Sequence, residues 1–170
     1  LDEGGRLIVT LAGAMSTAQI GRSLGPAIKS QKVHAICCTG ANLEEDIFNL
    51  VARSKYEEIQ DWRQLSPADE ELLRERGMNR VTDVALPEVV FREIEESLMS
   101  LWQDASEVGD RRFPHEYLYD LLIHGELEFD IDSEKSWLAC AADANLPIFT
   151  PGWEDSTLGN ILAARVLDRT

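Results

Sequence analysis

The chain has 170 residues, which is enough for one domain with a sizeable buried core. Its 31 acidic residues outnumber its 16 basic residues, and the net charge of −15 argues against nucleic acids and anionic membrane surfaces as partners. This charge suits a small cationic substrate, although an acidic surface that only keeps a globular protein in solution explains it as well.

The three cysteines and the lack of long apolar runs indicate in which cellular compartment the protein is expected. Cys37 and Cys38 are adjacent and cannot form an ordinary disulfide, and with Cys140 they offer no zinc-ligand spacing, so we expect no metal. We expect all three to be reduced, buried thiols, which predicts a cytoplasmic protein. No apolar run approaches the length of a membrane span, and no signal peptide is recognisable.

The N-terminal part of the chain alternates strand and helix signals. A nearly continuous apolar run over 6–11 predicts a strand that is buried on both faces. Apolar positions four residues apart predict a helix over 16–30, which Pro26 should kink or end early. Residues 33–38 predict the next strand. Two strands joined by a helix are expected to pair in parallel, as in Rossmann-like α/β sheets.

A turn of small residues follows each of these strands, over 12–17 and 39–41. After the second turn, Asn42 with Glu45 three residues on reads as a capping box, which opens a helix over 42–52. Open α/β sheets bind ligands at such strand-to-helix turns. Neither turn fits the G-x-G-x-x-G fingerprint, so the spacing alone does not establish a dinucleotide site.

The middle of the chain, 53–130, is acidic and is interrupted by Pro and Gly. Pro67 begins one helix that ends at Gly77, and Pro87 opens a longer helix with an apolar stripe. Pro114 begins a further helix. We interpret this stretch as a helical excursion from the sheet and not as a second domain.

The C-terminal part repeats the strand–turn–helix arrangement. We expect a helix over 132–144, a short third strand over 147–150 and a helix over 157–167 after another turn. The predicted fold is therefore a single α/β domain over 1–170, a Rossmann-like parallel sheet flanked by helices. The chain lacks an initial Met and stops just past an apolar helix, so we expect it to be part of a larger domain.

Acidic residues stand at two of the three turns. Glu44, Glu45 and Asp46 follow the second turn, and Asp155 lies in the third. Because the carboxyl ends of parallel strands meet at one edge, we expect the turns to gather there. A buried polyamine needs several carboxylates as partners. Acids at a helix start also cap backbone N–H groups and favour the helix dipole. Both interpretations stay open, and Glu45 is the residue best placed to serve both roles.

Other chemically interesting side chains have plainer explanations. Trp137 and Trp153 are better explained as packing anchors than as walls of a cation site. Ser16 and Ser156 lack the His/Asp arrangement of a serine hydrolase.

Taken together, the turns resemble the deoxyhypusine synthase family. Thr-Gly-Ala-Asn-Leu-Glu-Glu-Asp over 39–46, Asn-Arg-Val over 79–81 and Pro-Gly-Trp-Glu-Asp-Ser-Thr-Leu-Gly-Asn over 151–160 carry the likeness. Order and spacing fit along essentially the whole chain, and the synthase-like proteins of bacteria are the most similar branch. Within that family, this chain looks like the N-terminal half.

The resemblance implies an NAD-dependent transfer of an aminobutyl group from spermidine to an acceptor amine. In deoxyhypusine synthase the acceptor is a lysine of the precursor of translation factor 5A, and in the related homospermidine synthases it is putrescine. The family also implies a homotetramer. Its catalytic lysine belongs to the C-terminal portion, so we expect no catalytic residue within these 170 residues.

The resemblance also implies site residues, position by position. NAD contacts are implied at Gly13, Ala14, Met15, Ser16, Thr17, Thr39, Gly40, Ala41, Glu45 and Asp155. Polyamine contacts are implied at Glu44, Glu45 and Asn160. Gly13 and Ala14 replace the family's usual Ser-Asn pair, so only backbone contacts to the cofactor could remain there. Asn160 stands where eukaryotic members have a polyamine-binding aspartate, and its neutral amide suggests a non-catalytic polyamine-binding protein as a further alternative.

Overall fold

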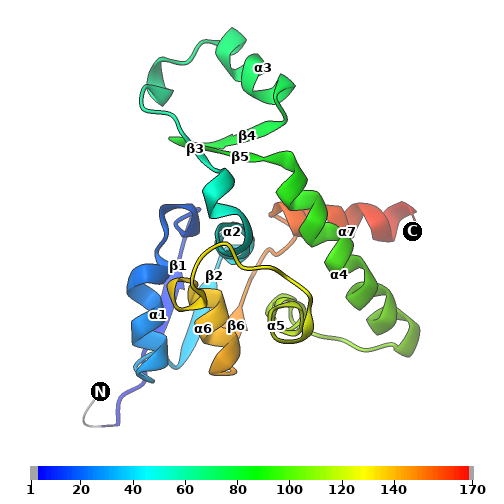
Figure 1. Ribbon diagram of the computed structural model, residues 1–170. Helices are drawn as coiled ribbons and strands as arrows, with labels where there is room; N and C mark the ends of the chain where they lie inside the picture. The colour runs from blue at the N-terminus through cyan, green and yellow to red at the C-terminus, as the bar shows by residue number, and fades with distance from the viewer. Residues whose placement is uncertain (1–3, 169–170) are drawn as a thin grey trace.

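The computed structural model describes residues 4–168. A parallel sheet of three strands, with helices beside it, forms one part of the molecule (Figure 1). A small antiparallel sheet and α3 (Pro67–Glu75) stand at the other end of the view. The α/β class predicted from the sequence is confirmed, and the second sheet is an addition to it.

The parallel sheet has the order β1-β2-β6, with β1 at Ile8–Leu11, β2 at Ala35–Cys38 and β6 at Ile148–Phe149. Ile36 pairs with Val9 on one side and with Ile148 on the other. This register confirms the predicted parallel pairing. The prediction that the first strand is buried on both faces is wrong, because β1 is an edge strand and Ile8 is 61% exposed.

The helix expected over 16–30 is divided in two. A 3₁₀ helix covers Ser16–Ala18, and α1 runs over Gly21–Lys29 after Gln19, which has a left-handed φ of 59°. Pro26 lies inside α1 without ending it at once. The start of α1 is closely packed, since a Cβ on Gly21 would lie 2.1 Å from the Lys135 carbonyl oxygen. Only glycine lets the start of α1 lie this close to the backbone that precedes α6.

The helix after β2 begins earlier than the capping-box reading predicted. In α2 (Gly40–Ala52) the N-cap is Thr39, whose hydroxyl accepts a hydrogen bond from the Asn42 amide at 3.3 Å. Asn42 therefore lies inside the first turn of the helix, and the predicted capping box of Asn42 with Glu45 is wrong.

The excursion over 53–130 is only partly helical. It contains α3, α4 (Glu88–Val108) and α5 (Pro114–His124), together with 3₁₀ helices at Arg53–Lys55 and Trp62–Gln64. It also contains an antiparallel sheet that was not predicted from the sequence. This sheet has the order β3-β5-β4 and comprises β3 (Glu57–Glu58), β4 (Met78–Val81) and β5 (Val84–Pro87).

The two ends of the excursion lie together. The backbone N–H of Asp130 donates to the Leu50 carbonyl oxygen at 2.8 Å, and the Asp130 side chain accepts from the Ser54 amide. The chain thus returns to the parallel sheet at the place where it left. It continues through a 3₁₀ helix at Ser133–Lys135, α6 (Trp137–Asp143), β6 and α7 (Thr157–Asp168), so the helix predicted over 132–144 is also divided.

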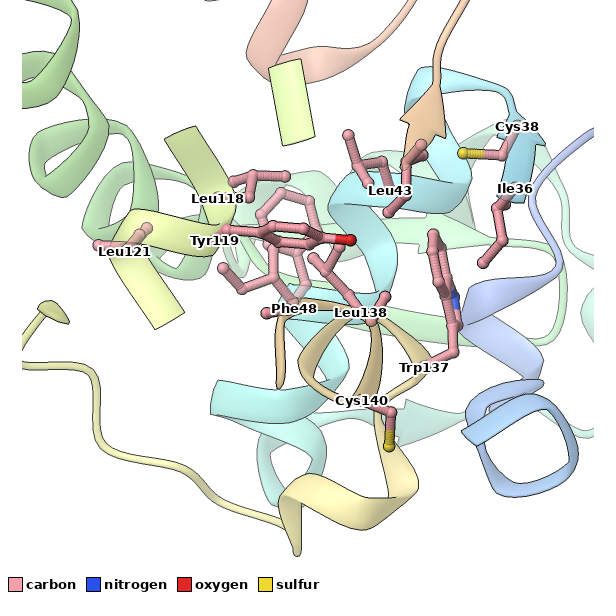
Figure 2. Close-up of a cluster of buried hydrophobic side chains, with 14 of the residues drawn as sticks. Ile36, Cys38, Leu43, Phe48, Leu118, Tyr119, Leu121, Trp137, Leu138 and Cys140 are labelled. Carbon is pink, nitrogen blue, oxygen red and sulfur yellow. The ribbon is translucent and has the colours of Figure 1, made fainter. Parts of the chain in front are cut away.

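The main core lies between the sheet, α2, α5 and α6. Figure 2 shows Trp137, Phe48 and Leu138 among the side chains packed there, and these three are 0 to 1% exposed. Trp137 is thus a packing anchor, as predicted, and its indole N–H donates to Ser16 Oγ at 3.0 Å. No helix in the range 4–168 is both long and apolar enough to cross a bilayer.

Candidate functional site

The three turns that follow β1, β2 and β6 meet at the carboxyl edge of the parallel sheet. We call them the first corner (12–17), the second corner (39–46) and the third corner (150–160). Thr39 Oγ1 donates to the Gly13 carbonyl oxygen at 2.6 Å, which joins the second corner to the first. The predicted gathering of the corners is therefore confirmed, and the contacts below show how it is achieved.

Asn42 holds the first corner in place. Its Oδ1 accepts from the Met15 amide at 2.9 Å, and its Nδ2 donates to the Gly13 carbonyl oxygen at 2.7 Å. The side chain is fully buried, so these bonds replace the water that the polar backbone of the turn would otherwise bind. Sequence reasoning took Asn42 for a helix cap, and no signal in its spacing pointed to this contact across the sheet edge.

Glu45 also faces the first corner. Its Oε2 accepts a hydrogen bond from the Thr17 amide at 3.1 Å, and the side chain is half-buried. Burial raises the pKa of the Glu45 carboxyl, and the hydrogen bonds from Thr17 oppose that shift. A carboxylate with a further free acceptor site at a partly open position can also pair with a ligand cation.

Glu44 faces the third corner instead. Oε1 accepts from the Thr157 amide at 2.9 Å and Oε2 from the Leu158 amide at 2.8 Å, at the start of α7. The residue is only 4% exposed. Burial raises the pKa of the Glu44 carboxyl, while the hydrogen bonds from Leu158 and Thr157 lower it.

Backbone packing brings the second and third corners together closely. A Cβ on Gly40 would lie 2.6 Å from Ser156 Cβ, and one on Gly159 would lie 2.0 Å from the Trp153 carbonyl oxygen. Glycine is required at Gly40 because a side chain there would push the second and third corners apart, and at Gly159 because a side chain there would collide with the Trp153 backbone within the third corner.

Asp46 is directed away from the corners. Its Oδ2 accepts from Ser136 Oγ at 2.5 Å and from the Leu138 amide at 3.0 Å, at the start of α6. Complete burial raises the pKa of Asp46 to about 6, and these hydrogen bonds limit the shift. Asp46 therefore has a structural role at the start of α6.

The remaining predicted residues lie at the surface of the corners. Asp155 and Asn160 are exposed, and Asn160 Nδ2 donates to the Ser156 carbonyl oxygen at 2.9 Å. In the first corner Gly13, Ala14 and Met15 are exposed, whereas Ser16 and Thr17 are buried. The predicted site residues of all three corners thus lie at one edge of the sheet, but their side chains differ in how far they are exposed.

A cavity of about 570 Å³ adjoins the first corner. Ala14 and Thr17 line it on one side, and Trp62 and Thr82 line it on the side of the second sheet. Sequence reasoning missed this second wall, because the hairpin that carries Thr82 was not predicted. Among residues 4–168 no group of three or more His, Cys, Asp or Glu side chains is arranged to hold a metal ion.

An open parallel sheet whose strand-to-helix corners converge at one edge has the arrangement at which α/β proteins bind their ligands. The family model for deoxyhypusine synthase matches residues 2–169. The chain therefore belongs to the deoxyhypusine synthase family, as the resemblance in the sequence indicated.

Individual relatives are distant and much longer. "Probable deoxyhypusine synthase 1" of Methanosarcina acetivorans is 27% identical over 149 residues, which is 88% of this chain and 43% of that protein. "Probable deoxyhypusine synthase" of Halobacterium salinarum is 26% identical over 161 residues, with 95% and 45% covered. The chain thus spans less than half the length of these curated relatives. The predicted likeness to the bacterial branch stays a prediction.

The fold is also found in a solved structure. The crystal structure of a "putative deoxyhypusine synthase" from Entamoeba histolytica aligns with a TM-score of 0.58 and 16% identity. The alignment covers 96% of this chain and 46% of that one. This likeness supports the arrangement of strands and helices, and by itself says nothing about the reaction.

Proposed function

We propose that this chain forms part of an enzyme that transfers an aminobutyl group from spermidine to an acceptor amine with the help of NAD, the acceptor being a lysine of the precursor of translation factor 5A. The observation that carries the proposal is the meeting of three corners at one sheet edge in a member of the deoxyhypusine synthase family. NAD, when bound, would supply the acceptor for the hydride that spermidine loses.

The first requirement is a place for the cofactor. In the part of the chain that the structure describes, the backbone N–H groups of Gly40 and Ala41, at the start of α2, have no acceptor. Free N–H groups at a helix start favour an anion such as a dinucleotide phosphate. The exposed carboxylate of Asp155 suits a ribose hydroxyl pair, as acids at this edge do in related α/β sites. The fit of these groups supports NAD as the cofactor.

The second requirement is a place for a polycation. Glu45 is half-buried at the meeting of the first and second corners and keeps acceptor capacity beyond its bond to Thr17. Its charge would pair with one ammonium group of spermidine, and the amide oxygen of the exposed Asn160 would accept a hydrogen bond from another. The overall charge of −15 favours the approach of such a ligand.

The remaining elements of the proposal lie outside these residues. A lysine that carries the aminobutyl group would be supplied from a part of the protein beyond this chain. We further propose that the complete enzyme is a cytoplasmic homotetramer, in line with the free thiols of Cys37, Cys38 and Cys140.

The test uses the full-length protein with spermidine, NAD and one of two acceptors. Release of 1,3-diaminopropane with labelling of the factor precursor supports the proposal. Labelling of putrescine instead would identify a homospermidine synthase, which the sequence also allows. Binding of spermidine without any release of diaminopropane would favour a non-catalytic polyamine-binding protein, the reading suggested by the neutral side chain of Asn160.

Two variants of the full-length protein locate the site. Replacing Glu45 or Asp155 by Ala is expected to weaken binding of spermidine or NAD, measured by calorimetry. The matched control is Glu154→Ala, which removes an exposed carboxylate next to Asp155 that the resemblance does not assign to a ligand. Unchanged binding in both site variants would refute the site assignment and leave the fold untouched.

A further inference from the structure

We infer that Glu44 is a positioning residue, which orients the third corner for ligand binding, and is not itself a ligand of the polyamine. This inference rests on the proposed function, because it assigns a role within the same site. It departs from the contact that family resemblance implies for Glu44, and it follows from where the carboxylate points.

The contacts of Glu44 use both of its oxygens on one element. Oε1 and Oε2 accept from the amides of Thr157 and Leu158, 113 and 114 residues further along the chain. These amides belong to the first turn of α7, where backbone N–H groups have no partner within the helix. The pairing satisfies two such groups, and the negative charge is favourable at the positive end of the helix.

Burial separates Glu44 from the residues that can reach a ligand. Glu44 is 4% exposed, whereas Asp155 and Asn160 are both exposed. Asp155 lies two residues before Thr157, and Asn160 lies two residues after Leu158. The bonds to Glu44 therefore sit between the two exposed side chains and fix the piece of backbone that carries both.

A second contact explains why orientation depends on this carboxylate. Gly40 packs directly against the Ser156 side chain, and this contact sets the distance between the two corners. The two hydrogen bonds from α7 to Glu44 add a directional link to this packing and orient the first turn of α7. Glu45 differs, because among residues 4–168 only one of its oxygens accepts a hydrogen bond and its side chain is less buried.

The contacts of Glu44 also determine at which helix N-terminus the backbone amides remain available to an anion. The carboxylate already occupies the Thr157 and Leu158 amides of α7, while the Gly40 and Ala41 amides of α2 have no acceptor among the described residues. The Thr157 and Leu158 amides are therefore not available to a cofactor phosphate, whereas the Gly40 and Ala41 amides are. The third corner would therefore contact a ligand through its side chains and not through the first amides of α7.

The experiment uses Glu44→Gln in the full-length protein, because the amide keeps the size of the side chain and loses its charge and one acceptor. Hydrogen exchange is read at the Thr157 and Leu158 amides without ligand, and NAD and spermidine affinities are measured by calorimetry. We expect exchange at these amides to become faster and NAD affinity to fall about tenfold. Glu154→Gln, a charge loss at an exposed position of the same corner, is expected to change neither.

A double-mutant cycle separates positioning from direct contact. If Glu44 acts through Asp155, Glu44→Gln should weaken NAD binding less than about twofold once Asp155→Asn is present. Equal losses in both backgrounds, or unchanged exchange at the α7 amides, would overturn the inference.

A second variant covers the case in which Glu44→Gln does not fold. Thr157→Pro deletes one donor to Glu44 at the first position of α7, where proline is tolerated, and leaves the Glu44 charge intact. Positioning predicts weaker NAD binding in this variant, whereas a direct ligand role predicts no change. If the wild-type protein binds neither NAD nor spermidine, the proposed function is wrong. The third corner then has no role in binding these ligands. The exchange result then reports separately on the Glu44 contact itself.

Discussion

The carboxylate of Asp46 accepts a hydrogen bond from the backbone amide of Leu138 at 3.0 Å, which joins α2 to the start of α6 across 92 residues of sequence. Glu44, on the same helix, makes the equivalent contact with α7. The acids of the second corner thus fasten two later helices to one earlier helix.

Asp46→Asn should change how stability depends on pH. Burial raises the pKa of Asp46 from 3.8 to about 6 in the folded protein. The folded state therefore holds a proton that the unfolded state has released, and this contribution to stability, present below pH 3.8, is lost as the pH rises through 6. The advantage of wild type over Asp46→Asn should shrink by up to about 3 kcal/mol between pH 4 and 7 in urea unfolding. The prediction would be contradicted if the unfolding free energies of wild type and Asp46→Asn changed in parallel with pH.

Glu95→Gln should show the opposite dependence. Glu95 on α4 is 5% exposed and pairs with Arg165 of α7 and with Arg92, each at 2.8 Å. The Arg165 and Arg92 guanidinium groups lower the pKa of this carboxyl. Its stabilising contribution is therefore present at neutral pH and lost as the pH falls through the lowered pKa.

We expect Glu95→Gln to be less stable than wild type by about 2 kcal/mol at pH 7, with the difference closing in acid. The matched control is Glu96→Gln at the exposed neighbouring position, which should stay within about 0.5 kcal/mol. The measurement is urea unfolding from pH 7 down to pH 3. If the difference in unfolding free energy between wild type and Glu95→Gln widened in acid, the two arginines would not be stabilising the Glu95 charge.

Gly40→Ala should separate the second and third corners. The added methyl would lie 2.6 Å from Ser156 Cβ and 3.2 Å from the Trp153 carbonyl oxygen, so the backbone must move. We expect a loss of about 3 kcal/mol in thermal or urea unfolding. Gly109→Ala is the control, because nothing lies within 4 Å there and only the positive φ of 68° opposes the methyl, at about 1 kcal/mol. Equal losses of unfolding free energy in the two variants would show that the second and third corners can move apart at little cost.

The three thiols should react unequally. Burial raises the pKa of Cys38 to about 12 and raises that of Cys140, while Cys37 is half-buried. At pH 8 the thiolate fraction of the two buried residues is therefore small. Mass spectrometry after brief labelling with N-ethylmaleimide should find Cys37 modified first, and all three modified in urea. Early labelling of Cys38 would indicate that β2 opens in the native state.

The α/β part of the fold could be predicted because its signals are local. Apolar runs ended by small residues marked β1, β2 and β6, although the exposure of β1 depends on which strands pair beside it. The hairpin of β4 and β5 could not be predicted. Its strands have four residues each, and its turn uses Thr82 in a left-handed conformation in place of the expected glycine.

The site was predictable in position but not in the roles of its residues. Glu44, Glu45 and Asp46 are consecutive on a helix, so their side chains point about 100° apart and meet three different segments. The sequence shows three acids at one corner. Only the folded neighbours decide that Glu44 meets α7, Glu45 meets the first corner and Asp46 meets α6.

The hydrogen bonds between Asp130 and the chain at Leu50 and Ser54 close the excursion at its base. Because its entry and exit are already held side by side, lengthening or shortening it adds little to the entropy of closing the loop. Evolution or a protein engineer could therefore change the length of the loops within this stretch, while α5 keeps its place in the core and the corners of the parallel sheet keep theirs.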